Sequence, residues 1–259
     1  MTPIFDTHAH YDDAAFEEDR EELLGHMREQ GVAHIVNVGA SMQGCRDTLS
    51  LVKRFPDLYG ALGVHPDEVG SMTGEDLDWI AAHVHEERIV AVGEIGLDYY
   101  WDNAEHDVQK LWFRRQLNLA REQKLPVIIH SRDAAGDTYE LMKEEHAEEI
   151  GGVIHCFSYS KEMAALFLKM GFYIGIGGVV TFKNARKVKE AVEEIPLDRL
   201  VLETDSPYLS PDRGKRNDSR NISMVVSTIA QIKGITEEDV RRTAYENACR
   251  LYRLPFREV

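Results

Sequence analysis

A pair of histidines near residue 6 is spaced to bind a divalent cation. The residues Asp6-Thr7-His8-Ala9-His10 directly follow the short apolar segment Pro3-Ile4-Phe5. Alternate side chains of a β-strand share a face, so Asp6, His8 and His10 are expected to point the same way. Two imidazoles at the end of a strand can hold one cation, and Asp6 could orient them from behind. Alone, the pattern also fits two unrelated polar residues, so its meaning depends on the rest of the chain.

Further histidines and carboxylates follow apolar segments later in the chain. The polar residues at or near the ends of these segments are His8, His10, His65, Glu94, His130, His155 and Asp205, and most of them could be metal ligands. Imidazoles with carboxylates suit zinc, and the carboxylates also admit manganese or magnesium. These ligands are too many for one tetrahedral zinc, but they suit two divalent cations bridged by a carboxylate. Glu94, central in the order of the strands, is the expected bridge, and hydrolysis by activated water is the expected chemistry.

Neighbouring residues of the same types serve as controls. His83 and His85 repeat the spacing of His8 and His10, but they lie in a predicted helix, where residues two apart face roughly opposite sides. They are not expected to chelate. Cys156 follows His155, and in a strand its side chain would point to the other face. We therefore expect Cys156 to be a buried small residue and not a metal ligand.

Short apolar segments alternate with longer amphipathic ones along the whole chain. Strands are predicted at 4–8, 34–38, 59–65, 89–95, 126–130, 152–157, 172–177 and 200–204. Helical spacing of apolar residues predicts helices at 17–30, 42–54, 75–85, 105–124, 134–146, 161–170, 185–194, 223–233 and 237–252, the last one capped by Thr236. This alternation indicates a parallel sheet with both faces covered. The predicted fold is α/β: one domain over residues 1–259, a (β/α)8 TIM-type barrel with an extra C-terminal helix.

In such a barrel the polar residues at the strand ends converge on one rim, the carboxyl-terminal face. A second set of side chains is predicted to bind substrate phosphates at this rim: His65, Arg132, Lys183, Arg213 and Arg216. The loops after the last two strands of a barrel often bind phosphate, and arginine matches phosphate oxygens in a bidentate way. For the loop that follows the last strand, a basic surface segment balancing an acidic protein is the alternative interpretation.

The composition limits the classes of protein to consider. The chain has 259 residues with a formal net charge of −15, which argues against a protein that binds nucleic acid over a broad surface. A local basic pocket remains compatible with it. The few cysteines, Cys45, Cys156 and Cys249, do not form a disulfide framework, so a cytoplasmic location is expected. No signal peptide or membrane span is expected.

Six motifs follow one another in a fixed order along the chain. They are DTHAH at 6–10, GVHP at 63–66, GEIGLDY at 93–99, HSRDA at 130–134, HCFS at 155–158 and ETDSPYL at 203–209. Together they resemble the TatD family of metal-dependent hydrolases over essentially the whole chain. The resemblance implies an amidohydrolase-like barrel and a divalent-metal-dependent deoxyribonuclease that typically degrades DNA 3′→5′. It also implies six metal ligands: His8, His10, Glu94, His130, His155 and Asp205. It also implies that Glu94 takes the place of a modified lysine found in many other amidohydrolases.

One loop departs from the pattern of the family. Residues 214–219 read GKRNDS, where the family usually has GKRNEP. Without the proline the loop is expected to be less constrained, which bears on the range of substrates more than on the chemistry.

The preferred reading is hydrolysis of a phosphodiester, with single-stranded DNA ends as the expected partner. Divalent cations bring the pKa of water near neutrality, and Asp205 would accept the proton and return it to the leaving oxygen. Glu203 shares a predicted strand face with Asp205 but lies one step deeper in the barrel. It is expected either to support the metal ligands from behind or to be a buried acid without a role in the site. A carboxyl-ester, lactone, amide or aminoacyl-tRNA deacylase on the same metals is the alternative, and an inactive metal-binding protein is the second. The sequence leaves open the metal, DNA versus RNA, and the oligomeric state.

Overall fold

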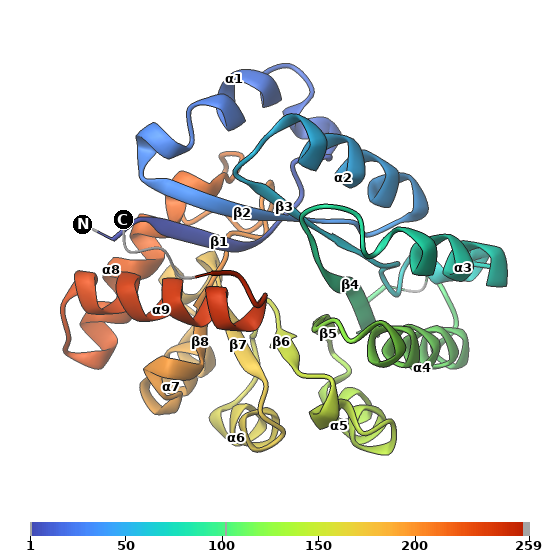
Figure 1. The fold of residues 1–259 in the computed structure, drawn as a ribbon. Coiled ribbons are helices and arrows are strands. Elements are labelled where there is room, and N and C mark those ends of the chain that lie inside the picture. Colours follow the sequence, from blue (N-terminus) through green and yellow to red (C-terminus); the bar gives the residue numbers. More distant parts are fainter. Residues whose placement is uncertain (1, 102, 256–259) are drawn as a thin grey trace.

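A parallel eight-stranded sheet forms the centre of the computed structural model, which describes residues 2–101 and 103–255. The strands neighbour one another in chain order, and each is parallel to the next. They are β1 (Ile4–Ala9), β2 (Val32–Val38), β3 (Leu58–Leu62), β4 (Ile89–Asp98), β5 (Val127–Arg132), β6 (Gly152–Ile154), β7 (Tyr173–Ile176) and β8 (Leu200–Leu202). In Figure 1 the sheet curls into a nearly closed barrel with helices around it. The predicted single-domain (β/α)8 architecture is confirmed.

The helices connect successive strands on the outside of the barrel. They are α1 (Arg20–Gly25), α2 (Met42–Arg54), α3 (Gly74–His83), α4 (His106–Gln123), α5 (Ala135–Glu144), α6 (Lys161–Lys169), α7 (Arg186–Glu194), α8 (Ile222–Lys233) and α9 (Glu237–Leu251). Thr236 caps α9 as predicted, since its side chain accepts a hydrogen bond from the Asp239 backbone N–H. None of these helices is long and apolar enough to cross a membrane.

The first helix is shorter than its pattern predicted. Residues 17–30 form α1 over Arg20–Gly25 only, followed by a separate 3₁₀ turn at Arg28–Gln30 that ends at Gly31. No residue of α1 is buried. A helix draws most of its stability from packing an apolar face, so an exposed segment does not extend over the whole periodic stretch.

The two ends of the sheet meet where β1 lies against β8. Among the described residues an isolated bridge joins Ala9 to Ser206 there, in place of a regular ladder. The His8 carbonyl accepts a hydrogen bond from the Asp205 N–H at 2.9 Å, and the Ser206 carbonyl accepts one from the His10 N–H at 2.8 Å. The seam of the barrel therefore runs through segments that carry candidate metal ligands.

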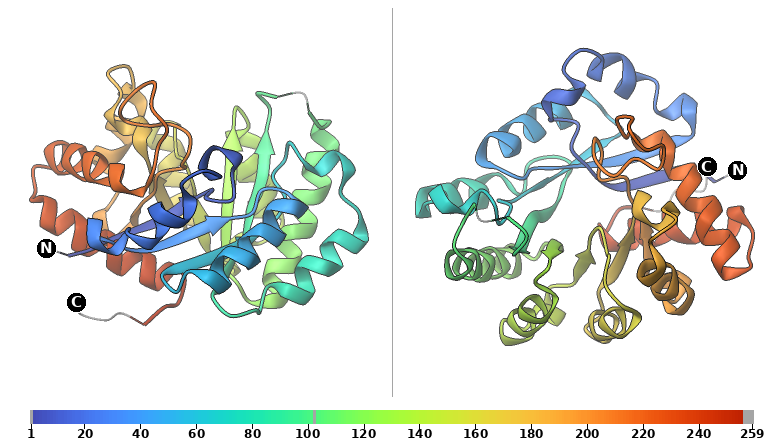
Figure 2. Two further views of the ribbon diagram at one scale, coloured as in Figure 1. Left: turned by 90° about the horizontal axis from the view of Figure 1, so that it is seen from above. Right: turned by 180° about the vertical axis from the view of Figure 1, so that it is seen from behind.

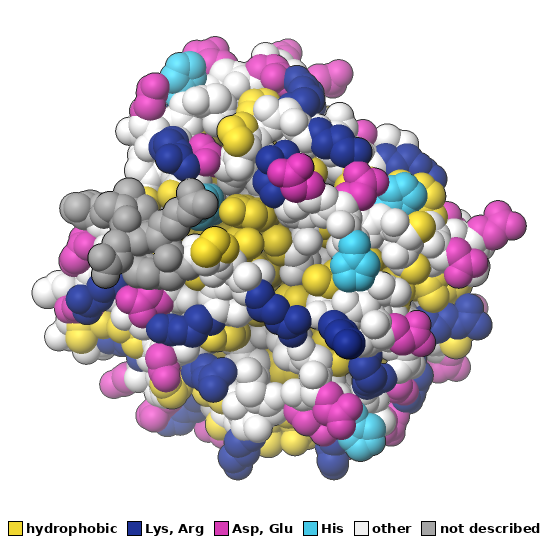
Figure 3. All heavy atoms as spheres, viewed as in Figure 1, with side chains coloured by type: hydrophobic (Ala, Val, Ile, Leu, Met, Phe, Trp, Pro, Cys, Tyr) yellow, Lys and Arg dark blue, Asp and Glu magenta, His cyan; other side chains and the backbone are white. Residues whose placement is uncertain are grey.

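An aromatic cluster closes the other end of the barrel, where the strands begin. Phe5 lies at the start of β1, with ring centroids 6.0 Å from both Tyr245 and Tyr252, the latter directly after α9. The Tyr252 hydroxyl donates to the Thr7 carbonyl at 2.9 Å. Figure 1 shows α9 lying across this end, and Figure 2 shows the loop after β8 on the opposite side. Positive and negative side chains are interspersed on the face that carries α9 (Figure 3).

Candidate metal centre

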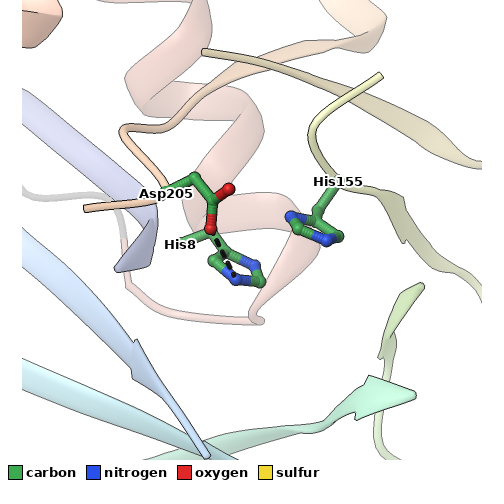
Figure 4. Close-up of side chains that lie close together, drawn as sticks. All are labelled: His8, His155 and Asp205. Carbon is green, nitrogen blue, oxygen red and sulfur yellow. Dashed lines mark ion pairs between the residues drawn. The ribbon is translucent and has the colours of Figure 1, made fainter. Parts of the chain in front are cut away.

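The six predicted ligands converge at the carboxyl-terminal ends of the strands. His8 belongs to β1 and Glu94 to β4, His130 belongs to β5, and His155 and Asp205 follow β6 and β8. Figure 4 shows the side chains of His8, His155 and Asp205 gathered at one place, with the ion pair between His8 and Asp205 marked. The two rings stack with centroids 3.9 Å apart at an interplanar angle of 9°. Segments almost two hundred residues apart thus meet at one site, as the barrel prediction requires.

Glu94 occupies the middle of this cluster, and its two carboxylate oxygens face different sets of nitrogens. Oε1 lies 2.7 Å from His130 Nδ1 and 2.6 Å from His155 Nε2. Oε2 lies 3.4 Å from His8 Nε2 and 3.5 Å from His10 Nε2. A carboxylate with one oxygen toward each of two ligand sets has the arrangement needed to bridge two cations.

Asp205 completes the set around the first histidine pair. Its Oδ1 lies 3.7 Å from His8 Nε2 and 3.5 Å from His10 Nε2. Its side chain is 16% exposed, compared with 4% for Glu94. Asp205 is therefore the carboxylate of the pair that water and substrate can reach.

The donor atoms fit divalent cations. Among the described residues the ligand atoms of four groups lie within 4.8 Å of one another: His8, His10 and Glu94; His8, His155 and Asp205; Glu94, His130 and His155; and His65, Asp98 and His130. His8 Nε2 and His10 Nε2 are 3.0 Å apart, as are His130 Nδ1 and His155 Nε2. Each such pair can share at most one proton, so these buried nitrogens present lone pairs to a common space. Nitrogen and carboxylate donors gathered in this way suit zinc, manganese or magnesium.

The electrostatics of the metal-free chain separate the histidines into two classes. Burial would lower the pKa of His10, but the hydrogen bond to Asp205 and the charge of Glu94 outweigh it and raise that pKa to about 10. Burial and the neighbouring His155 lower the pKa of His8 to about 4. Burial would raise the pKa of Glu94, yet the surrounding imidazoles hold it well below its usual value. The carboxylate is therefore ionised, and a cation would compete with protons for the site.

Two further contacts orient the histidine rings. His10 Nδ1 lies 2.8 Å from the Val38 carbonyl, which fixes the ring with Nε2 toward Glu94. His130 Nε2 lies 3.0 Å from Asp98 Oδ2 at the end of β4. Together with Glu94, Asp98 raises the pKa of His130 to about 9 against the opposing effect of burial. Such partners are typical of metal-binding histidines. No role was expected for Asp98 from the sequence, although a carboxylate at the end of the strand beside His130 was a usable indication.

Asp6 does not orient the histidine rings, so that expectation was wrong. Its carboxylate accepts hydrogen bonds from the Thr204 N–H at 3.0 Å, the Thr204 hydroxyl at 2.6 Å and the Ser219 hydroxyl at 2.6 Å. The pairing of β1 with β2 shifts register between Asp6 and Ala9, which breaks the two-residue alternation assumed for the strand. Asp6 instead ties β1 to the segment after β8.

β3 and β6 each end three residues earlier than predicted, which changes the setting of His65 and Cys156. β3 ends at Leu62, so His65 lies in the following loop, where its Nε2 is 3.8 Å from Glu94 Oε1. β6 ends at Ile154, and Cys156 has a positive φ of 44°. Cys156 is half-buried outside the strand, not in the strand interior as expected, and its backbone N–H donates to the buried Glu203. Glu203 Oε1 lies 4.0 Å from His155 Nδ1, so it contacts the site from behind.

Of the control histidines, His83 lies in α3 as predicted, but His85 lies in the turn after that helix and not in the helix itself. His83 stacks on Trp79 with ring centroids 4.0 Å apart, and its Nδ1 contacts the Trp79 carbonyl at 2.7 Å. His85 Nε2 contacts Gln123 at 2.9 Å. Within residues 2–101 and 103–255, neither belongs to a group that could hold a metal.

The basic residues predicted to bind phosphate differ in whether a carboxylate pairs with them. Arg216 is held by Asp19 and by the Ala15 carbonyl at 2.6 Å, and its guanidinium covers the Phe16 ring at 4.5 Å. These contacts favour a structural role. Arg132, Lys183 and Arg213 form no ion pair with any described carboxylate. Arg213 donates to the Asn184 side-chain oxygen at 3.3 Å and lies over the Phe182 ring at 4.5 Å. The loop without the family proline is nevertheless fixed, because Asn217 is buried and its side chain donates to the Thr204 and Tyr208 carbonyls at 2.8 Å.

Comparison with known proteins gives a consistent result over the whole chain. The family model described as TatD related DNase matches residues 5–253. An uncharacterized metal-dependent hydrolase, YabD of Bacillus subtilis (strain 168), is 45% identical over 97% of this chain and 99% of its own. YcfH of Escherichia coli (strain K12), also an uncharacterized metal-dependent hydrolase, is 36% identical over 97% and 96%. The crystal structure of YjjV, a TatD homolog from Escherichia coli K12, superposes with a TM-score of 0.92 at 29% identity, covering 97% of this chain and 98% of that one.

Proposed function

We propose that this chain, which belongs to the TatD family of metal-dependent hydrolases, cleaves phosphodiester bonds in DNA and removes nucleotides from single-stranded 3′ ends. The observation that supports it best is Glu94, whose oxygens face one nitrogen set each: His8 and His10 on one side, His130 and His155 on the other. A bridging carboxylate of this kind is typical of paired-cation sites that act on phosphoryl groups.

The chain would hold two divalent cations, zinc, manganese or magnesium, through the six converging residues. His8, His10 and Asp205 would serve one cation and His130 and His155 the other, with Glu94 contributing to both. When bound, such cations lower the pKa of water and stabilise negative charge on phosphoryl oxygens. The chain supplies the fixed geometry, since His10 and His130 are oriented by the Val38 carbonyl and by Asp98.

Asp205 is the proposed general base. Burial would raise its pKa, but the hydrogen bond from His10 and the nearby imidazoles lower it, so the carboxylate is ionised near neutral pH. It is also the more exposed carboxylate of the cluster. Asp205 would take the proton from the attacking water and deliver it to the leaving oxygen of the cleaved bond.

Basic side chains at the rim that lack a carboxylate partner favour a phosphodiester substrate over a neutral ester. Arg132 ends β5 two residues after His130 and projects at the same rim. Lys183 and Arg213 lie on the loops after β7 and β8. Positive groups at the rim would bind substrate phosphates and stabilise charge in the transition state, with His65 close to Glu94.

The deciding experiment combines metal analysis of the purified protein with parallel assays in Mg²⁺, Mn²⁺ and Zn²⁺. The substrates are 5′-labelled single-stranded DNA, a matched duplex, a matched RNA and model carboxyl esters and lactones. We expect stepwise shortening of single-stranded DNA from its 3′ end. Turnover of esters or lactones without DNA cleavage would favour the carbonyl hydrolase. Bound metal without turnover of any substrate would favour an inactive metal-binding protein.

A further inference from the structure

Two large aromatic side chains stand exposed at the rim next to the metal centre. Tyr100 is 53% exposed and Trp101 is 48% exposed, and both directly follow the end of β4. Their rings are perpendicular, with centroids 4.7 Å apart. Large rings this accessible are costly to leave in water, and side by side at the mouth of a site they offer flat faces to a ligand.

The backbone of this pair is tied to the metal centre through one carboxylate. Asp98 Oδ1 accepts hydrogen bonds from the Tyr100 N–H at 2.8 Å and the Trp101 N–H at 3.4 Å. Its other oxygen lies 3.0 Å from His130 Nε2. A single side chain therefore fixes both a candidate metal ligand and the turn that carries the rings. The distance of the Tyr100 and Trp101 rings from the metal centre is therefore fixed by the fold and does not depend on a mobile loop.

Arg132 joins the two rings into one surface. Its guanidinium lies over the Tyr100 ring at 3.8 Å and near the Trp101 ring at 5.6 Å. In the sheet Arg132 is paired with Asp98, so it stands beside the turn. Stacking on Tyr100 holds the planar cation in place, and no described carboxylate neutralises it. A cation between aromatic faces matches a ligand that carries a phosphate and a flat ring together.

We propose that Tyr100, Trp101 and Arg132 form a nucleobase subsite, in which the Trp101 ring stacks on one unpaired base of the substrate while Arg132 binds a flanking phosphate. This inference rests on the proposed function and assigns to it a preference for single strands. A base inside a duplex has both faces covered by its neighbours, whereas an unpaired base is free to stack on an aromatic side chain. Tyr100 is a positioning residue that holds Arg132.

The test compares Trp101→Ala and Trp101→Phe with Ile235→Ala, an exposed apolar control beyond α8 at the other end of the barrel. The probes are a single-stranded oligothymidylate and the same strand with abasic sites in place of its last bases. Stacking of one base on an aromatic ring corresponds to a change of roughly 5-fold to 100-fold in binding. We expect Trp101→Ala to raise KM for the intact strand by about that factor. We expect little change on the abasic strand, recovery in Trp101→Phe and wild-type values in Ile235→Ala.

Binding is measured separately, by fluorescence anisotropy of the labelled strands with the Asp205→Asn protein and with Asp205→Asn carrying Trp101→Ala. Tighter binding of the intact strand than of the abasic strand, lost with Trp101→Ala, supports the subsite even if the wild-type protein cleaves no DNA. Equal binding and equal KM on both strands overturn the subsite, while cleavage of both would leave the nuclease proposal intact.

Discussion

The two ends of this barrel are formed by the same strands but are lined by different kinds of side chain. At the carboxyl-terminal end imidazoles and carboxylates crowd together, with His8 and His10 nitrogens 3.0 Å apart and Glu94 between ligand sets. At the amino-terminal end Phe5 packs among aromatic rings beneath α9. Crowded polar groups cost stability, whereas buried rings supply it. The barrel can therefore keep an unfavourable cluster at one end because the other end is well packed.

This comparison predicts that substitutions at the two ends affect different observables. The largest effect is expected for Asp205→Asn, which keeps the shape of the side chain but removes the charge that accepts a proton. Turnover should fall by roughly a factor of 10³ or more, while the protein still folds. At neutral pH the metal-free variant should lose only the part of its stability that comes from the pairing of Asp205 with protonated His10. Steady-state kinetics with saturating metal and thermal unfolding check the two parts.

Asp198→Asn is the matched control for this substitution. Asp198 is exposed and lies just before β8, whereas Asp205 follows it, so the same chemical change is made at opposite ends of one strand. Asp198→Asn should retain wild-type turnover. Full activity of Asp205→Asn in metal-replete buffer would remove Asp205 from the proposed role.

The converse is expected for Phe5→Ala at the closed end. Phe5 is 2% exposed, and its loss should lower the free energy of unfolding by about 3–5 kcal/mol. Below the unfolding transition the kcat per folded molecule should not change. Denaturant titration and active-site-normalised kinetics measure both values. A large fall in kcat without loss of stability would show that the two ends are coupled.

Metal removal should have a smaller effect on stability, and its dependence on pH has a defined sign. At a cation concentration of about 100 times the dissociation constant, bound metal adds roughly 3 kcal/mol. In the metal-free chain the pKa values of His10 and His130 are raised to about 10 and about 9. The stability that these protonated rings contribute is present below their unfolded pKa and is lost as the pH rises through the folded values.

Bound cations require unprotonated imidazoles, so they are favoured as the pH rises. The difference in melting temperature between metal-loaded and chelated protein should therefore widen from about pH 7 to about pH 10. Paired thermal scans with and without a chelator measure this difference. A constant difference over that range would mean that protons and cations do not compete for these rings.

The smallest effect is expected for Arg132→Ala. Loss of one phosphate contact should raise KM for single-stranded DNA about 10-fold and reduce the slope of log affinity against log salt by about 1. Metal content should be unchanged, because Arg132 contacts Tyr100 and Trp101 and not the ligands. Unchanged KM in this variant would make Arg132 a structural residue.

The sequence predicted the order of elements and the gathering of the six ligands, because both follow from regular rules. Strand and helix periods alternate, and strand ends of a barrel share one rim. The position of His155 beside Glu94, at 2.6 Å, needed only the order of the strands and not their exact ends. Predicting the end of β6 three residues too late therefore did not change the expected position of His155.

Details that depend on irregular backbone were not predictable. A register shift in β1 turned Asp6 away from the rings that it was expected to orient. The contact between Asp98 and His130 depends on the length of β4, which extends beyond the predicted end at Ile95 to Asp98. The pairing of Arg216 with Asp19 was not predictable either, because the two residues are distant in sequence. Local periodicity contains no information on such pairs.

The seam between β1 and β8 makes the timing of activity depend on completion of the fold. The Asp205 N–H donates to the His8 carbonyl, so the first and last candidate ligands are joined by the main chain itself. During synthesis the first strand must wait for some two hundred residues before its partner emerges. A nascent or truncated chain that lacks the final strand would hold only part of the candidate cation site, so it should show no hydrolase activity until β8 is in place.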